Sequence, residues 1–242
     1  MVFDDEGSAG ADPGRRCLRL GTVTTSRALQ TGVALVWLGA AVGFFVLEAV
    51  AAAAMVPPYN YADHYISALG VPARSPRAAA MNTALYAQGI LFFAGAVLVV
   101  RGTAASHSRL FLCLVAINTV GNIAVATVHQ GSADSASGSG WLHGVGAGLA
   151  IVAGNAAIVA GSACLAPSVG VRWYRGASVA LAGVGFVGLV MLVRALVIPA
   201  ASTLDPGVWE RMSVYSTLIW QILSAVLLLT HSIRRPSAGS KR

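Results

Sequence analysis

Six long apolar runs, each able to cross a lipid bilayer as a helix, dominate this sequence. A spanning helix needs about 20 mostly apolar residues. The runs occupy residues 29–54, 78–100, 109–129, 142–165, 176–198 and 212–232. Only 10% of the residues are charged, whereas an ordinary soluble domain has about 25%. The sequence therefore predicts an all-α, polytopic membrane protein with a bundle of six transmembrane helices.

Basic residues are distributed unevenly between the two ends of these runs. Twelve Lys and Arg residues fall in the two terminal segments and the loops at one end, and three fall at the other end. Cytoplasmic loops carry the excess of Lys and Arg, so both termini are predicted to be cytoplasmic. We expect a multi-pass protein of the plasma (inner) membrane. It would have a disordered polar tail over residues 1–27, a transmembrane domain over 28–233 and a basic tail over 234–242.

The net charge of +7 raises the question of nucleic-acid binding. The basic residues are spread in small groups between the apolar runs and form no continuous stripe, which argues against a nucleic-acid partner. Membrane lipids, and a second membrane protein, are the partners that this pattern favours.

Two ionisable side chains, Glu48 and Arg194, are the clearest cases of a charge inside the runs, where charge is costly. Glu48 and Arg194 each come near the outer end of their run. An ion pair between the first and fifth helices would stabilise both charges. We expect this pair to belong to a polar pocket at the extracytoplasmic face, or else only to fix how the helices pack.

Small residues recur at intervals of four in two of the runs. Gly39 and Gly43 form one GxxxG motif, and Gly144 and Gly148 form another. Such motifs let helices approach closely in lipid. We therefore expect these glycines to lie at helix–helix contacts.

The third run carries polar residues along a single helical face. Asn118, Asn122 and His129 are four and seven residues apart, which places them on one side of a helix. Hydrocarbon offers these groups no hydrogen-bond partners, so the face is predicted to point into the bundle. Asn82 gives the second run a similar polarity and is assigned to the same pocket.

Three of the five histidines fall on the predicted extracytoplasmic side of the bundle. If their side chains meet there, they would form a catalytic or metal-binding site. His129 ends the third run, His143 begins the fourth, and His64 lies beside Asp63 in the first outer loop. Three histidines with a carboxylate are a ligand set for catalytic Zn²⁺, and Asp63 or Asp134 would serve as ligand or base. The alternative is a hydrogen-bonded polar cluster that holds no metal, because no pair has HExxH spacing.

The segment after the first run resembles a known signature. Residues 65–70, with Ile66, Ser67, Leu69 and Gly70 in order, resemble the I-S-x-L-G motif of bacterial membrane proteins in the domain-of-unknown-function family 998. His129 at the end of the third run, the residues at 141–143 and the six-span outline are also similar to that family. The chain is more distantly similar to the Frag/DRAM/Sfk membrane proteins, which are associated with lipid remodelling.

This resemblance implies a six-helix fold and no established reaction. Ala68 stands where the signature commonly has an acidic residue, which argues against an activity that depends on that acid. Ser67 is a candidate nucleophile near His64, although no GxSxG elbow surrounds it.

Three functions stay open at this stage. The first is a lipid-handling or accessory protein of envelope lipid processes, with the polar pocket at the extracytoplasmic face. The second is a membrane-embedded lipid hydrolase or transferase, in which the histidines act either as metal ligands or as acid–base groups. The third is a small-solute transporter, in which paired repeats or broken helices are common.

Overall fold

A computed structural model describes residues 27–103, 107–129, 138, 140–198 and 205–234. The predicted terminal tails fall almost entirely outside these residues, and so does Asp134. The described chain forms six helices that are long and apolar enough to cross a membrane, and its described residues contain no strand. The all-α, six-helix prediction is therefore confirmed, and the protein is an integral membrane protein.

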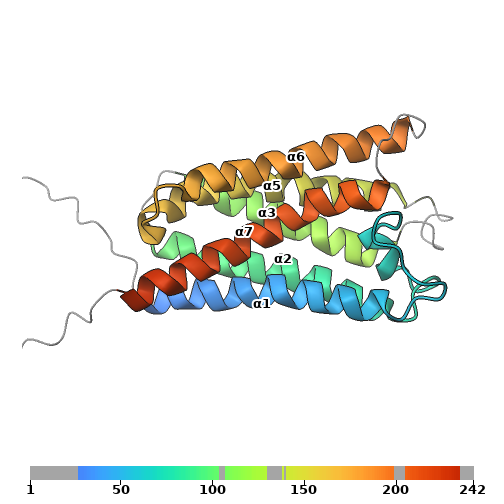
Figure 1. Ribbon diagram of the computed structural model, residues 1–242, viewed down its shortest axis with the longest axis horizontal. Coiled ribbons are helices and arrows are strands. Elements are labelled where there is room, and N and C mark those ends of the chain that lie inside the picture. Colours follow the sequence, from blue (N-terminus) through green and yellow to red (C-terminus); the bar gives the residue numbers. More distant parts are fainter. Residues whose placement is uncertain (1–26, 104–106, 130–137, 139, 199–204, 235–242) are drawn as a thin grey trace, which may run out of the picture.

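The helices form one bundle in which neighbours in the sequence mostly pack together (Figure 1). They are α1 (Arg27–Ala52), α2 (Ala78–Arg101), α3 (Ser108–Thr127), α5 (Trp141–Val169), α6 (Tyr174–Val197) and α7 (Pro206–Arg234), with a short 3-10 helix, η1 (Ile66–Gly70), between α1 and α2. α1 packs against α2 and α7, and α3 packs against α2 and α5. α6 packs against α5 and α7 at the side of the bundle.

The start of α1 and the end of α7 lie at the same end of the bundle, and η1 lies at the other (Figure 1). We call the latter the η1 end. An even number of spans requires this arrangement of the first and last helices. That the η1 end faces away from the cytoplasm stays a prediction from the distribution of charge.

Four aromatic rings fill the middle of the bundle. They are Trp37, Phe92, Phe111 and Trp220, from four different helices, and the centroids of every pair lie 5.2 to 6.4 Å apart. All four are fully buried. Gly95 faces the layer, and a Cβ there would lie 2.1 Å from Trp37 Nε1. The Trp37 ring therefore fits against α2 because residue 95 has no side chain. We call these four residues the aromatic layer.

The glycines of the two GxxxG motifs make no such contacts. A Cβ added at Gly39, Gly43, Gly144 or Gly148 would meet no atom within 4 Å among the described residues. The expectation that these motifs join helices of the bundle is wrong. Close approach occurs instead at glycines such as Gly121, where a Cβ would lie 2.4 Å from the backbone of Ala150. A GxxxG pattern does not show which side of a helix has a neighbour, and here both motifs face outward.

Candidate functional site

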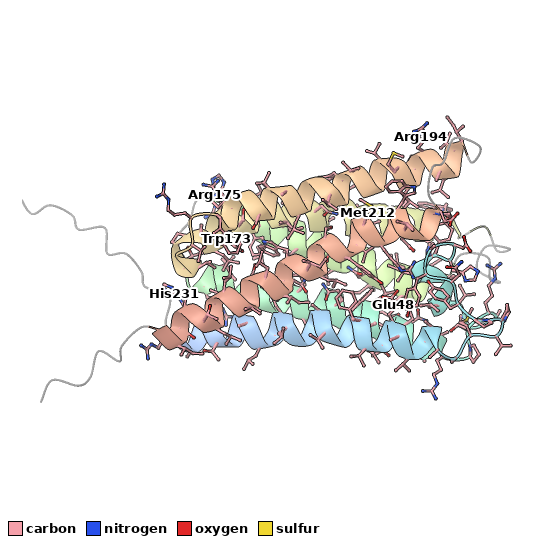
Figure 2. All side chains as sticks on the ribbon, in the orientation of Figure 1. Glu48, Trp173, Arg175, Arg194, Met212 and His231 are labelled. Atoms are coloured by element: carbon pink, nitrogen blue, oxygen red, sulfur yellow. The ribbon has the colours of Figure 1, made fainter. Side chains whose placement is uncertain are left out.

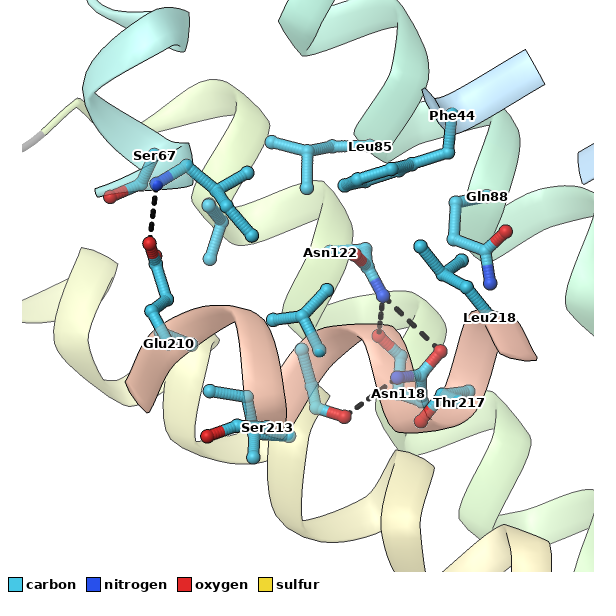
Figure 3. Close-up of a pocket in the computed structure, with 16 residues that line it drawn as sticks. Phe44, Ser67, Leu85, Gln88, Asn118, Asn122, Glu210, Ser213, Thr217 and Leu218 are labelled. Atoms are coloured by element: carbon cyan, nitrogen blue, oxygen red, sulfur yellow. Dashed lines mark hydrogen bonds between the residues drawn. The ribbon is translucent and has the colours of Figure 1, made fainter. Parts of the chain in front are cut away.

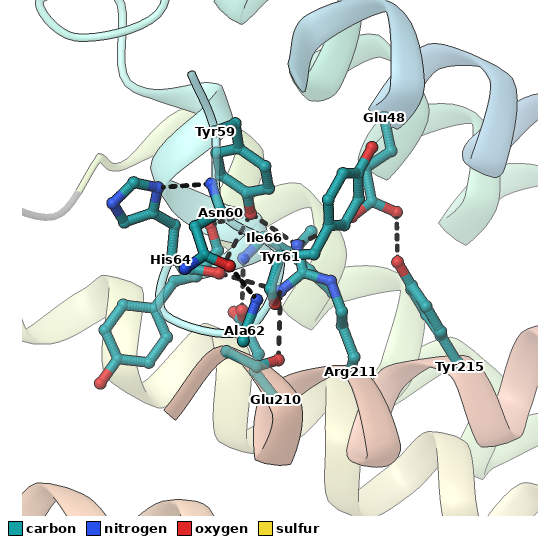
Figure 4. A network of polar contacts seen from close by, with 12 residues as sticks. Glu48, Tyr59, Asn60, Tyr61, Ala62, His64, Ile66, Glu210, Arg211 and Tyr215 are labelled. Atoms are coloured by element: carbon teal, nitrogen blue, oxygen red, sulfur yellow. Dashed lines mark hydrogen bonds and ion pairs between the residues drawn. The ribbon is translucent and has the colours of Figure 1, made fainter. Parts of the chain in front are cut away.

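Arg211 of α7 holds the loop between α1 and η1 against the bundle (Figure 4). Its NH1 nitrogen donates to the carbonyl oxygens of Tyr61 at 2.6 Å and His64 at 2.9 Å. Its NH2 nitrogen donates to the Tyr59 hydroxyl at 2.6 Å. The guanidinium carbon lies 5.4 and 4.8 Å from the ring centroids of Tyr59 and Tyr61, within the range of cation–π attraction. One side chain therefore fixes several points of the loop.

Glu48 of α1 is the counter-ion of Arg211. Its Oε1 accepts from Arg211 NH2 at 3.1 Å, and its Oε2 accepts from the Tyr215 hydroxyl at 2.7 Å. The Glu48 side chain is only 2% exposed, so these two partners, and not water, stabilise its negative charge. Glu48, Tyr59, Tyr61, Arg211 and Tyr215 together are called the arginine clamp below.

The predicted pairing of Glu48 with Arg194 is wrong. α1 packs against α7, whereas α6, which carries Arg194, packs against α5 and α7. Arg194 is exposed on α6, and α7 lies between it and Glu48 (Figure 2). The order of helices around the bundle therefore keeps the two predicted partners apart.

The tyrosines of the loop are kept in their neutral form. Burial raises the pKa of the Tyr59 phenol above its ordinary value, although the charge of Arg211 acts in the opposite direction. Burial likewise raises the pKa of Tyr61 and Tyr65. A neutral Tyr59 hydroxyl can donate to the Tyr65 carbonyl at 2.8 Å while it accepts from Arg211.

η1 is anchored at both of its ends. The backbone N–H of Ile66, at its start, donates to the Glu210 carboxylate on α7. The carbonyl of Gly70, at its end, accepts from Asn82 Nδ2 of α2 at 2.9 Å. A Cβ at residue 70 would lie 2.4 Å from Asn82 Oδ1. A side chain at the final glycine of the I-S-x-L-G motif would therefore displace the Asn82 amide from its bonds to the Gly70 carbonyl and His129.

The three predicted histidines lie in different environments. His129 Nε2 is 3.0 Å from Asn82 Nδ2. His143 is buried, and its Nδ1 is 2.6 Å from the carbonyl oxygen of Val128, so the ends of α3 and α5 adjoin as their short connection predicts. His64 is exposed on the loop, where its Nδ1 accepts from the backbone N–H of Asn60 at 3.2 Å.

The other predicted catalytic groups lie on the loop and on η1. Asp63 is exposed and accepts a hydrogen bond from Asn60 Nδ2, and Ser67 borders a cavity inside the bundle. In the part of the chain that the structure describes, no group of three or more His, Cys, Asp or Glu side chains is placed to hold a metal ion. The zinc hypothesis receives no support from this geometry and stays a prediction.

A cavity of about 60 Å³ lies beneath η1, between α2, α3, α5 and α7 (Figure 3). Six uncharged polar side chains line it: Ser67, Gln88, Asn118, Asn122, Ser213 and Thr217. Glu210 closes it beside η1, and Phe44, Leu85, Val125 and Leu218 supply apolar surface. The predicted inward orientation of Asn118 and Asn122 agrees with this placement, since both are buried and both face the cavity.

The amide groups in the cavity are partly satisfied by the protein itself. Asn118 Nδ2 donates to the carbonyl of Ala150 at 2.6 Å. Asn122 Nδ2 donates to the carbonyl and side-chain oxygens of Asn118 at 3.0 and 3.2 Å. Gln88 Oε1, in contrast, is buried without a hydrogen-bond partner in the structure. This oxygen has no accessible surface, so it points away from the cavity and a group inside the cavity does not reach it.

Residues 26–227 match the family model described as protein of unknown function (DUF998). The chain belongs to the DUF998 family. No curated protein and no solved structure matches it. The family membership that the I-S-x-L-G segment predicts is thus confirmed. In this DUF998 protein that segment is η1, which covers the cavity.

Two residues of the site, Glu210 and Arg211, lie outside the six runs, between the run that ends at residue 198 and the one that begins at residue 212. α7 begins at Pro206, so both lie in its first two turns. The signal was present: proline is favoured at the first position of a helix. A helix that starts there carries both side chains into the bundle.

Proposed function

We propose that this protein binds a lipid-like amphiphile by its polar end in the cavity beneath η1, as a lipid-handling or accessory component of the membrane. The single observation that supports this proposal is the mixed lining of the cavity. Small-molecule sites are mostly apolar clefts with a few convergent polar groups that fix orientation. Here the apolar side chains adjoin Gln88, Asn118, Asn122 and Glu210.

The size of the cavity limits what part of the ligand it holds. At roughly 10–15 Å³ for each water, a volume of about 60 Å³ accommodates about four to six waters. This space suits one polar end group of a few atoms. The rest of an amphiphile would then lie along the bundle among apolar residues.

The proposed location is the extracytoplasmic half of the membrane. This follows from the excess of Lys and Arg at the opposite end of the bundle. The arginine clamp supports a role for the loop as a fixed cover, because it ties the loop to α1 and α7 above the cavity.

Cavity filling tests the proposal. Ala147 of α5 borders the cavity, and Ala147→Leu would occupy it, whereas Ala49→Leu adds the same atoms on an exposed position of α1. Both variants are purified with the wild-type protein in a mild detergent, and their bound lipids are identified by native mass spectrometry. We expect a specific lipid on the wild type and on Ala49→Leu, and its loss from Ala147→Leu. Equal lipid on all three proteins would refute the proposal.

A second candidate, small-solute transport, is favoured by a second cavity at the opposite end. This cavity, of about 10 Å³, is lined by Gln30, Thr103, Cys164 and Ser168 among others. Along α1, Gln30 of the small cavity, Trp37 of the aromatic layer and Phe44 of the large cavity follow one another on one helical face. The aromatic layer thus separates two cavities, as a gate between two access points would.

Removal of a ring tests this second candidate. Trp220→Ala would open the aromatic layer, and proteoliposomes that contain it are compared with wild-type and protein-free liposomes in a glycerol-flux assay. Transport predicts faster glycerol entry with Trp220→Ala than with the wild type. Entry equal to that of protein-free liposomes for both proteins would count against it.

One form of the hydrolase alternative uses a bound metal. Metal analysis of the purified protein, repeated for His129→Ala and His143→Ala, tests it directly. Zinc bound to the wild type and lost from both variants would support a hydrolase. Protein free of metal that still binds its lipid would remove the basis for this alternative.

A further inference from the structure

We propose that the polar end taken by the cavity beneath η1 is an uncharged hydroxyl group, so that the ligand is a neutral lipid alcohol of the glyceride kind and not a lipid amine or phosphate. This inference rests on the proposed function and narrows it to a ligand class. Three features of the lining carry it: a free donor, a free acceptor close to that donor, and the lack of an unengaged charge.

Gln88 of α2 supplies the free donor. Its side chain lines the cavity and is only 4% exposed, and its polar atoms have no hydrogen-bond partner among the described residues (Figure 3). The oxygen is sealed by surrounding protein, so the amide nitrogen is the atom that faces the cavity. A buried donor without an acceptor is costly. An oxygen atom that enters the cavity would therefore stabilise this end of the bundle.

Asn122 of α3 supplies an acceptor close to this donor. Its Nδ2 donates to the carbonyl and side-chain oxygens of Asn118, which leaves its own Oδ1 without a donor among the described residues. The two helices touch at this level, since a Cβ at Gly89, next to Gln88, would lie 3.3 Å from Asn122 Cβ. Both amides line a cavity of about 60 Å³, so one small group can bond to both.

A hydroxyl is the smallest end group that suits both amides. Its oxygen accepts from Gln88, and its hydrogen is donated to Asn122 Oδ1. The match also holds after half a turn of the Gln88 amide, which would present oxygen in place of nitrogen, because a hydroxyl both donates and accepts. An ether only accepts and an ammonium only donates, so each would leave one amide unpaired.

The lining offers no unengaged charge to an ionic end group. Glu210 is the only ionisable side chain that lines the cavity in the described part of the chain. Its carboxylate already accepts from the backbone N–H groups of Ile66 and Ser67. The guanidinium of Arg211, the next residue, is bonded to the loop and to Glu48. An ammonium or a phosphate would therefore lose its hydration without gaining a free counter-ion, which is costly for a buried ion.

Four amphiphiles with one tail test the ligand class: dodecanol, dodecyl methyl ether, dodecylamine and dodecyl phosphate. Each is titrated into the full-length protein in nanodiscs of zwitterionic lipid, and bound copies are counted by native mass spectrometry. The same titration of Ala147→Leu, in which the cavity is filled, measures binding outside the cavity and is subtracted. We expect dodecanol to bind at least about tenfold more tightly than each of the other three probes.

Two substitutions of Gln88 test its amide without removing any hydrogen bond within the described protein. Gln88→Leu should weaken dodecanol binding by about tenfold, because the donor is lost. Gln88→Glu places a carboxylate against the cavity and should shift the preference from the alcohol to the amine. Thr83→Leu, at an exposed position of the same helix, is the matched control and should change neither.

The outcomes distinguish this inference from the proposed function. An amine or a phosphate that binds as tightly as dodecanol, and is lost in Ala147→Leu, would keep the cavity as a lipid site and overturn the ligand class. Dodecanol that binds equally to the wild type and to Gln88→Leu would also overturn it. Binding of all four probes that is the same in the wild type and in Ala147→Leu would count against both proposals.

Discussion

Replacing Arg211 by methionine should destabilise the protein more than any other single charge removal. The change keeps a long side chain and deletes the bonds to two loop carbonyls, to Tyr59 and to Glu48. Glu48, which is 2% exposed, would keep only Tyr215 of its two partners. Loss of one partner from a buried ion pair costs about 3–5 kcal/mol, and we expect the free energy of unfolding to fall by about that amount.

A double-mutant cycle separates the pair from the rest of the clamp. Wild type, Arg211→Met, Glu48→Gln and the double variant are unfolded reversibly in mixed micelles, and their free energies of unfolding are compared. In the double variant no buried charge is left unpaired, so its loss should be smaller than the sum of the two single losses by at least about 1 kcal/mol. Arg194→Met is the control, since that residue is exposed, and should change stability by less than about 0.5 kcal/mol.

Two results would refute this reasoning. Equal losses for Arg211→Met and Arg194→Met would show that the clamp has no special role. Strictly additive losses in the cycle would show that Glu48 and Arg211 do not depend on each other.

Three further predictions address the loop, η1 and the orientation. We expect Gly70→Ala to lower the free energy of unfolding by about 1–3 kcal/mol, because the new Cβ would lie 2.4 Å from the buried Oδ1 of Asn82. Thermal unfolding should show no comparable loss of stability for Gly144→Ala, because a Cβ at that position would meet no atom within 4 Å. The raised pKa of Tyr59 means that, above about pH 10, the unfolded state loses a proton that the folded state retains. Stability should therefore fall as the pH rises through that range, and less steeply in Tyr59→Phe. In intact cells an impermeant maleimide should label Arg74→Cys and not Arg101→Cys; the reverse pattern would invert the predicted orientation.

The six spans and the inward asparagines could be predicted because lipid imposes simple requirements. Every backbone polar group in hydrocarbon needs an internal partner, so long apolar runs must be helices. The four-residue spacing of Asn118 and Asn122 then determines that they share a face, and the cost of unpaired amides determines where that face points. Both properties depend on the sequence of a single helix and not on how the helices are arranged around one another.

The partners of charged residues could not be predicted in this way. Whether Glu48 meets Arg194 or Arg211 depends on the order of the helices around the bundle, which hydropathy does not encode. The start of α7 was also predicted wrongly. Glu210 and Arg211 lower the hydropathy of its first turns, so the apolar run begins at residue 212, whereas the helix begins at Pro206. The three candidate histidines lie at the predicted end of the bundle, where His129 and His143 are close enough to interact electrostatically, whereas His64 bonds within its own loop.

A high-resolution experimental structure in native lipid is the most direct test of the central claim that the cavity beneath η1 holds the polar end of an amphiphile. We expect elongated density that does not belong to the protein. The polar end of this density would lie within hydrogen-bond distance of the amide and carboxyl side chains that line the cavity, such as Asn122 and Glu210, and its tail would run along the bundle. Isolated waters alone in that cavity, in protein that retains its co-purified lipids, would contradict it.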